Sequence, residues 1–527
     1  MVRRRKHWGW GFQDEEPSAV EQAQAAAGLA EHLGFGSPEP EAPVPIERAR
    51  LPEPRVEPPA ALAAICSQDR RDRAEHARGK SYADVLRGLR GDFADAPDVV
   101  AHPRDERDVE AVLAWADDQR VAVVPFGGGT SVVGGVQLPR EQAPGGVLAL
   151  DLKGLDSVLE VDPVSRAARI GAGATGPRLE QQLAEHGLTM RFYPQSFELS
   201  TLGGWIATRA GGHFATGPTH VDDLVESIRA LTPVGAWESR RLPGSGAGVS
   251  PDRLLLGSEG TLGVITEAWV RVQPRPAARR SAAVRLPSFT RGAEALRSIV
   301  QAGLRPANCR LVDAGEAALT LAGDGTRALL VLGFESIEDV PVDAAMDHAL
   351  ALCAAQGGEW EERGPREGSA GAWREAFLRA PYLRDTFAAM GVLSETFETA
   401  ITWERLDGFV AEVGQAARQA LHEACGGGQV TCRLTHAYPD GAAPYFTVLA
   451  PARRGEEEEQ WWAVKRAASD ALIAAGGTIT HHHAVGRDHR PWYDRQRPDP
   501  FAAALRAAKA AVDPNAVLNP GVLIDPR

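Results

Sequence analysis

The chain has few cysteines and no spacing that would pair them. Only five occur among 527 residues, no CxxC pair is present, and the odd number argues against a disulfide framework. They are Cys66, Cys309, Cys353, Cys425 and Cys432. We therefore expect buried thiols in a reducing compartment, which predicts a cytoplasmic location.

Long apolar runs are missing too. None approaches the ~20 residues that a membrane-spanning helix needs. No signal-peptide core follows the basic residues Arg3, Arg4, Arg5 and Lys6; Trp8-Gly9-Trp10-Gly11 follows them instead. Such a segment either rests on a membrane surface or docks on its own protein. We expect docking, with peripheral membrane contact as the open alternative.

Positive charge is in deficit, since the formal net charge is -13. General affinity for nucleic acid is therefore not expected. A phosphorylated substrate would need locally placed arginine or lysine. With 44% apolar residues, the chain is long enough for at least two hydrophobic cores, because single cores stop growing near roughly 250–300 residues.

The first regular pattern begins near residue 95, after a Pro/Glu-rich stretch at 37–59 that is typical of a linker or surface wrap. Asp105 can cap a helix with the apolar face Val109, Val112, Leu113 and Ala116. Strands are expected next, at 121–124, 146–152, 157–161 and 167–170, with a helix at 176–186. This mixture predicts one α+β domain up to residue 275.

Pro274 and Pro276 mark a boundary to a second pattern. Helical stretches (291–302, 342–356, 406–424 and 456–475) alternate there with strand-like ones (328–334, 429–437 and 445–450). That alternation predicts an antiparallel sheet covered by helices. The expected division is 1–94 (N-terminal segment with linker), 95–275 (first domain), 276–480 (second domain) and 481–527 (a segment returning to the first domain).

A glycine-rich loop follows the strand at 121–124. It consists of Pro125, Phe126, Gly127, Gly128, Gly129, Thr130 and Ser131. Glycines reach φ > 0, and successive N–H groups can form a nest for an anion such as a pyrophosphate. The spacing is not that of a GxGxxG fingerprint, and no lysine follows as in a P-loop. The alternative is an ordinary Gly-rich turn.

Three further stretches favour a chain that lies against a flat ligand. The first is Pro194, Gln195, Ser196, Phe197, Glu198, Leu199 and Ser200. The second is Thr208, Arg209, Ala210 and Gly211. The third is Glu259, Gly260, Thr261, Leu262, Gly263, Val264 and Ile265. Each could alone be an unremarkable turn.

A histidine triplet, His481, His482 and His483, follows the strand-like Thr478–Thr480. On a strand, His481 and His483 would share one face and His482 would take the other. Three imidazoles offer proton acceptors near neutral pH. A metal site is one alternative, but only two rings could converge and no nearby Cys or carboxylate completes the set. We expect no metal; inconsequential surface histidines are the other alternative.

The glycine motifs, in this order and spacing, resemble the FAD domain of the vanillyl-alcohol-oxidase family, which has the PCMH-type fold. Residues 512–521 resemble that family's closing segment. The resemblance implies an α+β protein with a two-part PCMH-type FAD-binding domain and an antiparallel-sheet cap domain covered by helices. The motif residues would then bind the cofactor. Many members attach FAD to a histidine of the glycine loop; none is present here, so non-covalent FAD is expected.

The histidine triplet, Trp8–Gly11 and the stretches 381–385, 395–403 and 431–446 resemble the alkylglycerone-phosphate synthase family. That resemblance implies exchange of the acyl group of acyl-dihydroxyacetone phosphate for a fatty alcohol, redox-neutral through a flavin N5 adduct. It also implies roles for individual residues. Catalytic roles fall to Tyr445, which would exchange a proton with the substrate, and to His481, His482 and His483; substrate-binding roles fall to Arg384 and Arg310.

Two other functions stay open at this point. An FAD-dependent dehydrogenase or oxidase of a 2-hydroxy acid or phenol would share the FAD domain but transfer a hydride. A non-enzymatic metal- or flavin-binding protein belongs to a different class. A homodimer is compatible with the sequence as well.

Overall fold

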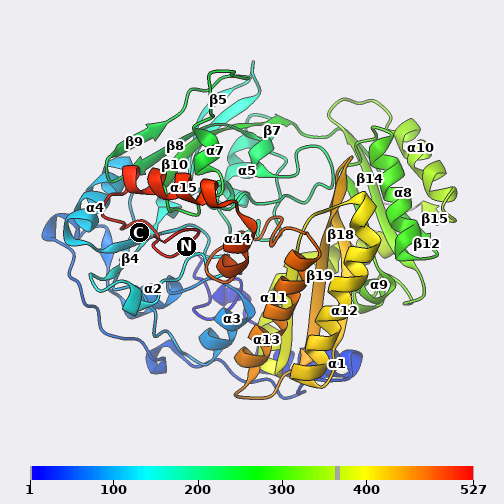
Figure 1. Ribbon diagram of the computed structural model, residues 1–527, viewed down its shortest axis with the longest axis horizontal. Coiled ribbons are helices and arrows are strands. Elements are labelled where there is room, and N and C mark those ends of the chain that lie inside the picture. Colours follow the sequence, from blue (N-terminus) through cyan, green and yellow to red (C-terminus); the bar gives the residue numbers. More distant parts are fainter. Residues whose placement is uncertain (1–2, 363–367, 526–527) are drawn as a thin grey trace.

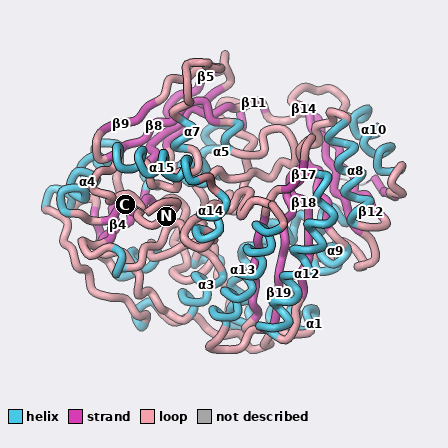
Figure 2. Tube along the Cα trace, viewed as in Figure 1, coloured by secondary structure: helices cyan, strands magenta, loops and turns pink. Residues whose placement is uncertain are grey.

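The protein has two halves that lie side by side in the computed structural model, which describes residues 3–362 and 368–525. In Figure 1 most of the chain between about residues 60 and 275 and the C-terminal helix α15 (Asp499–Val512) lie on one side, whereas the N-terminal helix α1 (Ala19–Leu33) lies on the other. A large sheet with its helices lies on the other side, and Figure 2 shows helices outside the strands there. The predicted α+β class, with an FAD-binding part and a cap, is confirmed.

The first half begins with a small mixed sheet in the order β1-β2-β4-β3. Its strands are β1 (Cys66–Ser67), β2 (Val99–Ala101), β4 (Val147–Asp151) and β3 (Ala122–Phe126). Helix α4 (Glu106–Gln119) covers it, and the Asp105 carboxylate accepts the N–H of Asp108 as the predicted cap. The apolar face predicted for this helix is buried against the sheet.

An antiparallel sheet in the order β5-β6-β10-β8-β9 forms the second part of this half. Its strands are β5 (Val158–Asp162), β6 (Ala167–Gly171), β10 (Val264–Arg271), β8 (Val225–Thr232) and β9 (Gly235–Glu238). Helices α5 (Gly176–Ala184), α6 (Leu202–Thr208) and α15 contribute to its core. A short pair, β7 (Leu188–Thr189) and β11 (Gln273–Pro274), leads to the cap.

The cap domain is built on one antiparallel sheet in the order β15-β12-β14-β13-β18-β19-β16, with β17 (Ile401–Thr402) paired to β19. The strands are β12 (Ala278–Leu286), β13 (Asn308–Val312), β14 (Ala328–Ser336), β15 (Glu359–Glu362), β16 (Val392–Glu398), β18 (Gln429–Ala437) and β19 (Gly441–Pro451). Helices α8 (Phe289–Gln301), α10 (Asp343–Ala354), α12 (Leu406–Cys425) and α13 (Glu457–Ala474) pack on its apolar face. The alternation predicted from the sequence is confirmed.

The two faces of this sheet differ in polarity because side chains alternate along a strand. On β19, Phe446 and Val448 join the core beneath the helices. Tyr445 and Thr447 point the other way and line a cavity. The sheet therefore presents a polar face toward the first half of the molecule.

The N-terminal segment docks on the protein, as predicted: Trp8 and Trp10 are 5% and 4% exposed. Helix α1 (Ala19–Leu33) then packs against α11 (Gly368–Met390), which carries Pro381 in its interior. Helix α3 (Tyr82–Leu89) also lies against α11. Among the described residues, no helix is long and apolar enough to cross a membrane.

The C-terminal segment packs against the first half of the molecule. The N–H of Val123 donates to the carbonyl of Val517, and the N–H of Asn519 donates to Val123, so the segment adds to the edge at β3. The Asn519 amide donates to the carbonyls of Gly135 and Glu259. The segment just after the glycine loop is thereby connected to the motif at 259–265.

The strand predicted at Thr478–Thr480 is wrong. Residues 478–483 have no regular secondary structure. The side chain of Glu398, at the end of β16, accepts the N–H groups of His481, His482 and His483. A single buried carboxylate thus replaces the ladder that a strand would need.

Candidate active site

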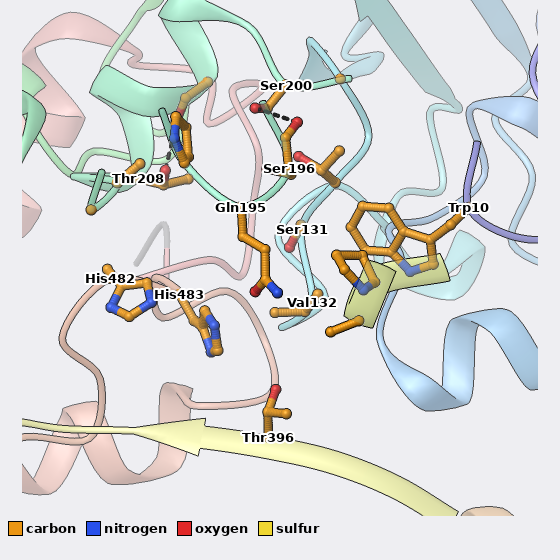
Figure 3. Close-up of a pocket in the computed structure, with 18 of the residues that line it drawn as sticks. Trp10, Ser131, Val132, Gln195, Ser196, Ser200, Thr208, Thr396, His482 and His483 are labelled. Carbon is orange, nitrogen blue, oxygen red and sulfur yellow. Dashed lines mark hydrogen bonds between the residues drawn. The ribbon is translucent and has the colours of Figure 1, made fainter. Parts of the chain in front are cut away.

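A cavity of about 380 Å³ lies between the two halves. The glycine motifs line one side, the polar face of the cap sheet lines another, and α1, α9 (Ala314–Leu319) and α11 close the far end. Figure 3 shows His482 and His483 on one side of it, Gln195 and Ser131 facing inward, and Trp10 on the opposite side. The cavity therefore brings together residues from the whole chain.

The glycine loop is packed so closely that side chains would not fit. A Cβ on Gly128 would lie 2.3 Å from the carbonyl oxygen of Leu199, and one on Gly127 would lie 2.3 Å from Oγ1 of Thr201. Gly129 has φ 62°, the left-handed conformation that favours glycine. The loop needs these glycines for close approach as much as for backbone freedom.

The N–H groups of this loop fit an anionic cofactor. Within the described residues, the N–H groups of Gly128, Gly129, Thr130 and Ser131 donate no hydrogen bond. Gly128 and Gly129 are buried, and buried backbone donors are nearly always paired. Consecutive unpaired donors on a cavity wall suit the oxygens of a pyrophosphate.

Most of the predicted cofactor-binding residues line the cavity. These are Pro125 to Ser131, Pro194, Gln195, Ser196, Ser200, Thr208, Ala210, Gly211, Glu259, Gly260, Gly263 and Ile265. Seven of them do not: Phe197, Glu198, Leu199, Arg209, Thr261, Leu262 and Val264.

These seven have other environments: Leu199 packs in the core of the cap domain, and the Thr261 hydroxyl donates to the carbonyl of Ser258. Leu262 packs in the core of the second sheet and Val264 in the core of the first. Arg209 pairs with Asp222 at 2.7 Å. Phe197 packs on Trp205, and Glu198 accepts the hydroxyl of Tyr382.

Glu259 connects the glycine motif at 259–265 with the segment that follows the histidine triplet. Its carboxylate accepts the N–H groups of Val485 and Gly486, both at 2.9 Å, just after the histidine triplet. Burial raises the pKa of Glu259 to about 7 against the opposing effect of those N–H groups. This side chain therefore anchors the triplet segment to the first half of the molecule.

Tyr445 sits at the centre of a row across three strands. Glu398 on β16 pairs with Tyr445 on β19, and Tyr445 pairs with Arg433 on β18. The Arg433 guanidinium lies 3.7 Å from the centroid of the Tyr445 ring, which is a cation–π contact. Glu316 holds Arg433 by an ion pair at 2.7 Å. The tyrosine ring is therefore fixed from both neighbouring strands.

Two members of the histidine triplet face this tyrosine. The ring centroids of His482 and His483 lie 6.1 and 5.6 Å from that of Tyr445. Both line the cavity, so the predicted alternation of faces is wrong for this pair. The loop around Glu398, rather than a pleated strand, turns both rings the same way.

His481 points elsewhere. Its Nε2 lies 2.8 Å from the hydroxyl of Tyr438, and its Nδ1 lies 3.0 Å from Nδ1 of His482. It is not among the cavity-lining residues. It contacts the imidazoles of His482 and His436, which line the cavity.

The imidazoles are uncharged at neutral pH. Burial lowers the pKa of His482 to about 3 and that of His483 to about 4, with Glu398 opposing the shift in both. Burial also lowers the pKa of His436 and of His481 well below the usual value. Burial would raise the pKa of Glu398, but the neighbouring imidazoles and the Thr480 hydroxyl lower it well below its usual range. The site thus holds neutral bases over an ionised carboxylate.

The expectation that no carboxylate lies near the triplet is wrong, because Glu398 does. Two groups are close enough for a shared metal ion: His436, His481 and His482, and Glu398, His482 and His483. Many of these atoms already have partners. His436 contacts the carbonyl of Gly212 and the hydroxyl of Thr435, and Glu398 accepts three N–H groups. The absence of a metal stays a prediction.

Arg384 and Arg310, the predicted substrate-binding residues, both line the cavity. Arg384 donates to the carbonyl of Lys80 at 2.8 Å, and Arg310 donates to that of His213 at 2.8 Å. Burial and the neighbouring Arg433 lower the pKa of Arg310 to about 9. Arg384 and Arg310 give the cavity the local positive charge that a phosphate would need, while the charge of Arg433 is paired with that of Glu316.

Sequence reasoning missed several residues of the site. Arg433, Glu398, Glu316, His436 and Tyr438 were assigned no role, and Trp10 was considered only as a docking or membrane contact. Arg433 could have been found, because Thr431, Arg433 and Thr435 form a polar period-two face on an otherwise apolar strand. Glu398 had no such signal, since its partners come from another part of the chain.

The chain matches two family models in succession. The model for an FAD binding domain covers residues 97–239, and the model for the C-terminal domain of FAD linked oxidases covers residues 275–523. FAD as the cofactor is thereby confirmed, and its non-covalent attachment stays a prediction.

An alkyldihydroxyacetonephosphate synthase from Caenorhabditis elegans is 30% identical over 72% of this chain and 68% of its own length. The chain belongs to the alkyldihydroxyacetonephosphate synthase family. This is the alkylglycerone-phosphate synthase family that the sequence motifs indicate.

Other alkyldihydroxyacetonephosphate synthases agree. Those of Dictyostelium discoideum and Trypanosoma brucei brucei are each 29% identical, over 86% and 90% of this chain and 78% and 82% of their own lengths. A solved alkyldihydroxyacetonephosphate synthase structure shares the fold with a TM-score of 0.81 at 24% identity, covering 98% of both chains. The prediction of an enzyme of this family is confirmed.

Proposed function

We propose that the protein exchanges the acyl group of acyl-dihydroxyacetone phosphate for a fatty alcohol and so forms an ether bond. One observation carries the proposal. Tyr445 and two neutral imidazoles face a single cavity that also contains the glycine loop and three arginines. An enzyme of this reaction needs a cofactor site, a phosphate site and proton transfer in one place.

FAD would be held by the glycine loop, by Ser196 and Ser200, and by Thr208 and Gly260, all of which line the cavity. The unpaired N–H groups of the loop suit its diphosphate. Bound FAD would supply a nucleophilic ring nitrogen for the exchange. The protein supplies position and proton transfer.

The phosphate of the substrate would bind between Arg384 and Arg310. Guanidinium groups match phosphate geometry and stay charged at neutral pH. Each is oriented by a backbone carbonyl, of Lys80 for Arg384 and of His213 for Arg310. Such fixed donors would place the reacting carbon of the substrate at the tyrosine.

Proton transfer would involve Tyr445 with His482 and His483. The imidazoles are neutral and can accept a proton from the tyrosine or from the incoming alcohol. Arg433 faces the tyrosine ring with its charge and stabilises negative charge that develops on the phenol oxygen. Tyr445 would then remove and return a proton at the substrate carbon.

The apolar end of the cavity would take the fatty chains. Leu29 and Leu33 of α1, Leu319 of α9 and Phe387 of α11 line it. Apolar walls exclude water, which protects the reaction from hydrolysis. The proposal includes a cytoplasmic protein with lipid substrates and without a nucleic-acid partner; peripheral membrane contact and a homodimer stay open predictions.

The test is Tyr445→Phe with its FAD retained. Loss of a general acid–base group is expected to lower the exchange rate by about 10²- to 10⁴-fold. Tyr493→Phe is the matched control, since Tyr493 does not line the cavity. Exchange at the wild-type rate in Tyr445→Phe would refute the role assigned to this tyrosine.

A further inference from the structure

The first residues of the chain contact both sides of the cavity. In residues 3–12, Arg5 reaches the glycine loop, while Lys6 and Trp10 reach α11. A second stretch, Gly79–Lys80, makes the same two connections. These two stretches together are called the N-terminal clamp below.

At the glycine loop, the clamp binds carbonyl groups. The Arg5 guanidinium donates to the carbonyl of Gly128 and, at 3.0 Å, to that of Leu199. The N–H of Lys80 donates to the carbonyl of Ser131 at 2.6 Å. The loop's carbonyls are thus fixed from outside, which leaves its N–H groups turned to the cavity.

At α11, the clamp binds the residue next to Arg384. The Asp385 carboxylate accepts the N–H of Trp10 at 3.0 Å and pairs with Lys6 at 3.2 Å. Both charged side chains are over nine-tenths buried, so the pair is little screened by solvent. Arg384 itself donates to the carbonyl of Lys80.

The fit of the clamp leaves no room for a side chain at two positions. A Cβ on Gly9 would lie 2.2 Å from Oδ2 of Asp385, and one on Gly79 would lie 2.1 Å from the carbonyl oxygen of Ser131. Arg71 holds the carbonyl of Arg5 at 2.9 Å and so fixes the segment from the first half. The clamp is therefore a packed bridge rather than a loose tail.

We propose that the N-terminal clamp is a positioning element that couples the two binding sites, so that the glycine loop and Arg384 are held in one arrangement. The proposal rests on the proposed function for the identity of the phosphate ligand. Arg5, Lys6 and Asp385 are positioning residues in it, because they act through the loop and through Arg384. A substitution at one end of the clamp must then weaken ligand binding at the other end, which is FAD at the glycine loop or the phosphate ligand at Arg384.

The test changes a residue at one end of the N-terminal clamp and measures ligand binding at the other end. Lys6→Met, whose contacts are with Asp385, is measured for the rate at which FAD leaves the holoenzyme, followed by flavin fluorescence. Arg5→Gln, whose contacts are with the glycine loop, is measured for binding of dihydroxyacetone phosphate to the holoenzyme by calorimetry. Arg3→Gln is the matched control, since Arg3 pairs with Asp14 at the surface.

Each crossed measurement is expected to change about tenfold, which corresponds to the loss of one charge-assisted contact. Arg3→Gln should change neither. Melting temperature and circular dichroism check folding, and Asp385→Asn, which preserves side-chain volume, replaces Lys6→Met if that variant does not fold. The proposal is overturned if Lys6→Met retains FAD as wild type does, or if Arg5→Gln affects FAD alone.

An error in the proposed function would give a different experimental result. If wild-type holoenzyme does not bind dihydroxyacetone phosphate, the phosphate site is wrong. The FAD measurement on Lys6→Met still decides the clamp, because it needs neither turnover nor a phosphate ligand.

Discussion

At the scale of single residues, Glu398 holds the histidine triplet without lining the cavity itself. It is 1% exposed, accepts three consecutive N–H groups and lies 3.4 Å from Nδ1 of His482. Its register neighbour is Tyr445. One carboxylate therefore sets the conformation of the histidine triplet and its distance from the tyrosine.

Glu398→Gln tests this role. The amide places an NH₂ group where the backbone N–H groups need an acceptor, so at least one buried donor loses its partner. We expect exchange activity to fall by about tenfold to a hundredfold, from a loss of roughly 1.5–3 kcal/mol, with FAD retained. The measurement is the rate of labelled alcohol incorporation.

The matched control is Glu404→Gln, at an exposed position six residues after Glu398 in the segment that leads to α12. It should behave as wild type. If Glu398→Gln does so too, Glu398 does not position the triplet.

The pH dependence of the reaction tests the neutral imidazoles. A free imidazole gains its proton near pH 6.5, whereas His483 has a pKa of about 4 and His482 of about 3. Because both values are lowered, the base form persists as the pH falls through 6.5. The acidic limb of kcat/KM should therefore have its midpoint below pH 6, and a midpoint near 6.5 or above would contradict the account.

At the scale of elements, the glycine loop is the part most sensitive to added volume. Gly128→Ala would place a methyl group against the carbonyl of Leu199, without any strain in φ. We expect the purified variant to lose most of its FAD, measured as the ratio of flavin absorbance to protein absorbance. Gly28→Ala in α1, where nothing lies within 4 Å, should retain FAD and be slightly stabilised; equal FAD in both variants would be inconsistent with close packing of the loop.

Elements with regular periodicity could be predicted from the sequence. The helix capped by Asp105 and the strands around Tyr445 were found because local pattern and buried face agree. The segment before the histidine triplet was misread because its conformation is set by Glu398, which is distant in sequence. Tertiary hydrogen bonds override a short local pattern.

At the scale of the whole molecule, buried neutral histidines make stability depend on acid. His436, His481 and His489 have pKa values well below the usual one, with burial as the largest cause. The unfolded chain binds protons on these rings near pH 6.5 and the folded chain does not, so stability falls as the pH drops below that value.

His102 acts in the opposite direction. Its pKa is raised to about 9 by Asp151 and Asp72, so its contribution is present below pH 6.5 and is lost as the pH rises through 9. The melting temperature should decline from pH 7 to pH 5, because more of the histidines have a lowered pKa than a raised one. A melting temperature that rises toward pH 5 would contradict the assigned protonation states.

The way the two halves close over the cavity could not be predicted from the sequence. The glycine motifs, the triplet and Tyr445 were identified singly by their motifs. Their meeting depends on pairings such as Arg5 with Gly128 or Glu259 with Val485, which leave no periodic signal. The FAD-binding half and the cap could be predicted because each has its own core.

The most direct test of the account is isotope exchange under anaerobic conditions. Purified holoenzyme is given acyl-dihydroxyacetone phosphate and a labelled fatty alcohol while the flavin spectrum is followed. The account predicts labelled ether product with the yellow oxidised spectrum unchanged from start to finish. The absence of ether product would contradict it, and bleaching of the flavin in a parallel sample given a 2-hydroxy acid would indicate a dehydrogenase instead.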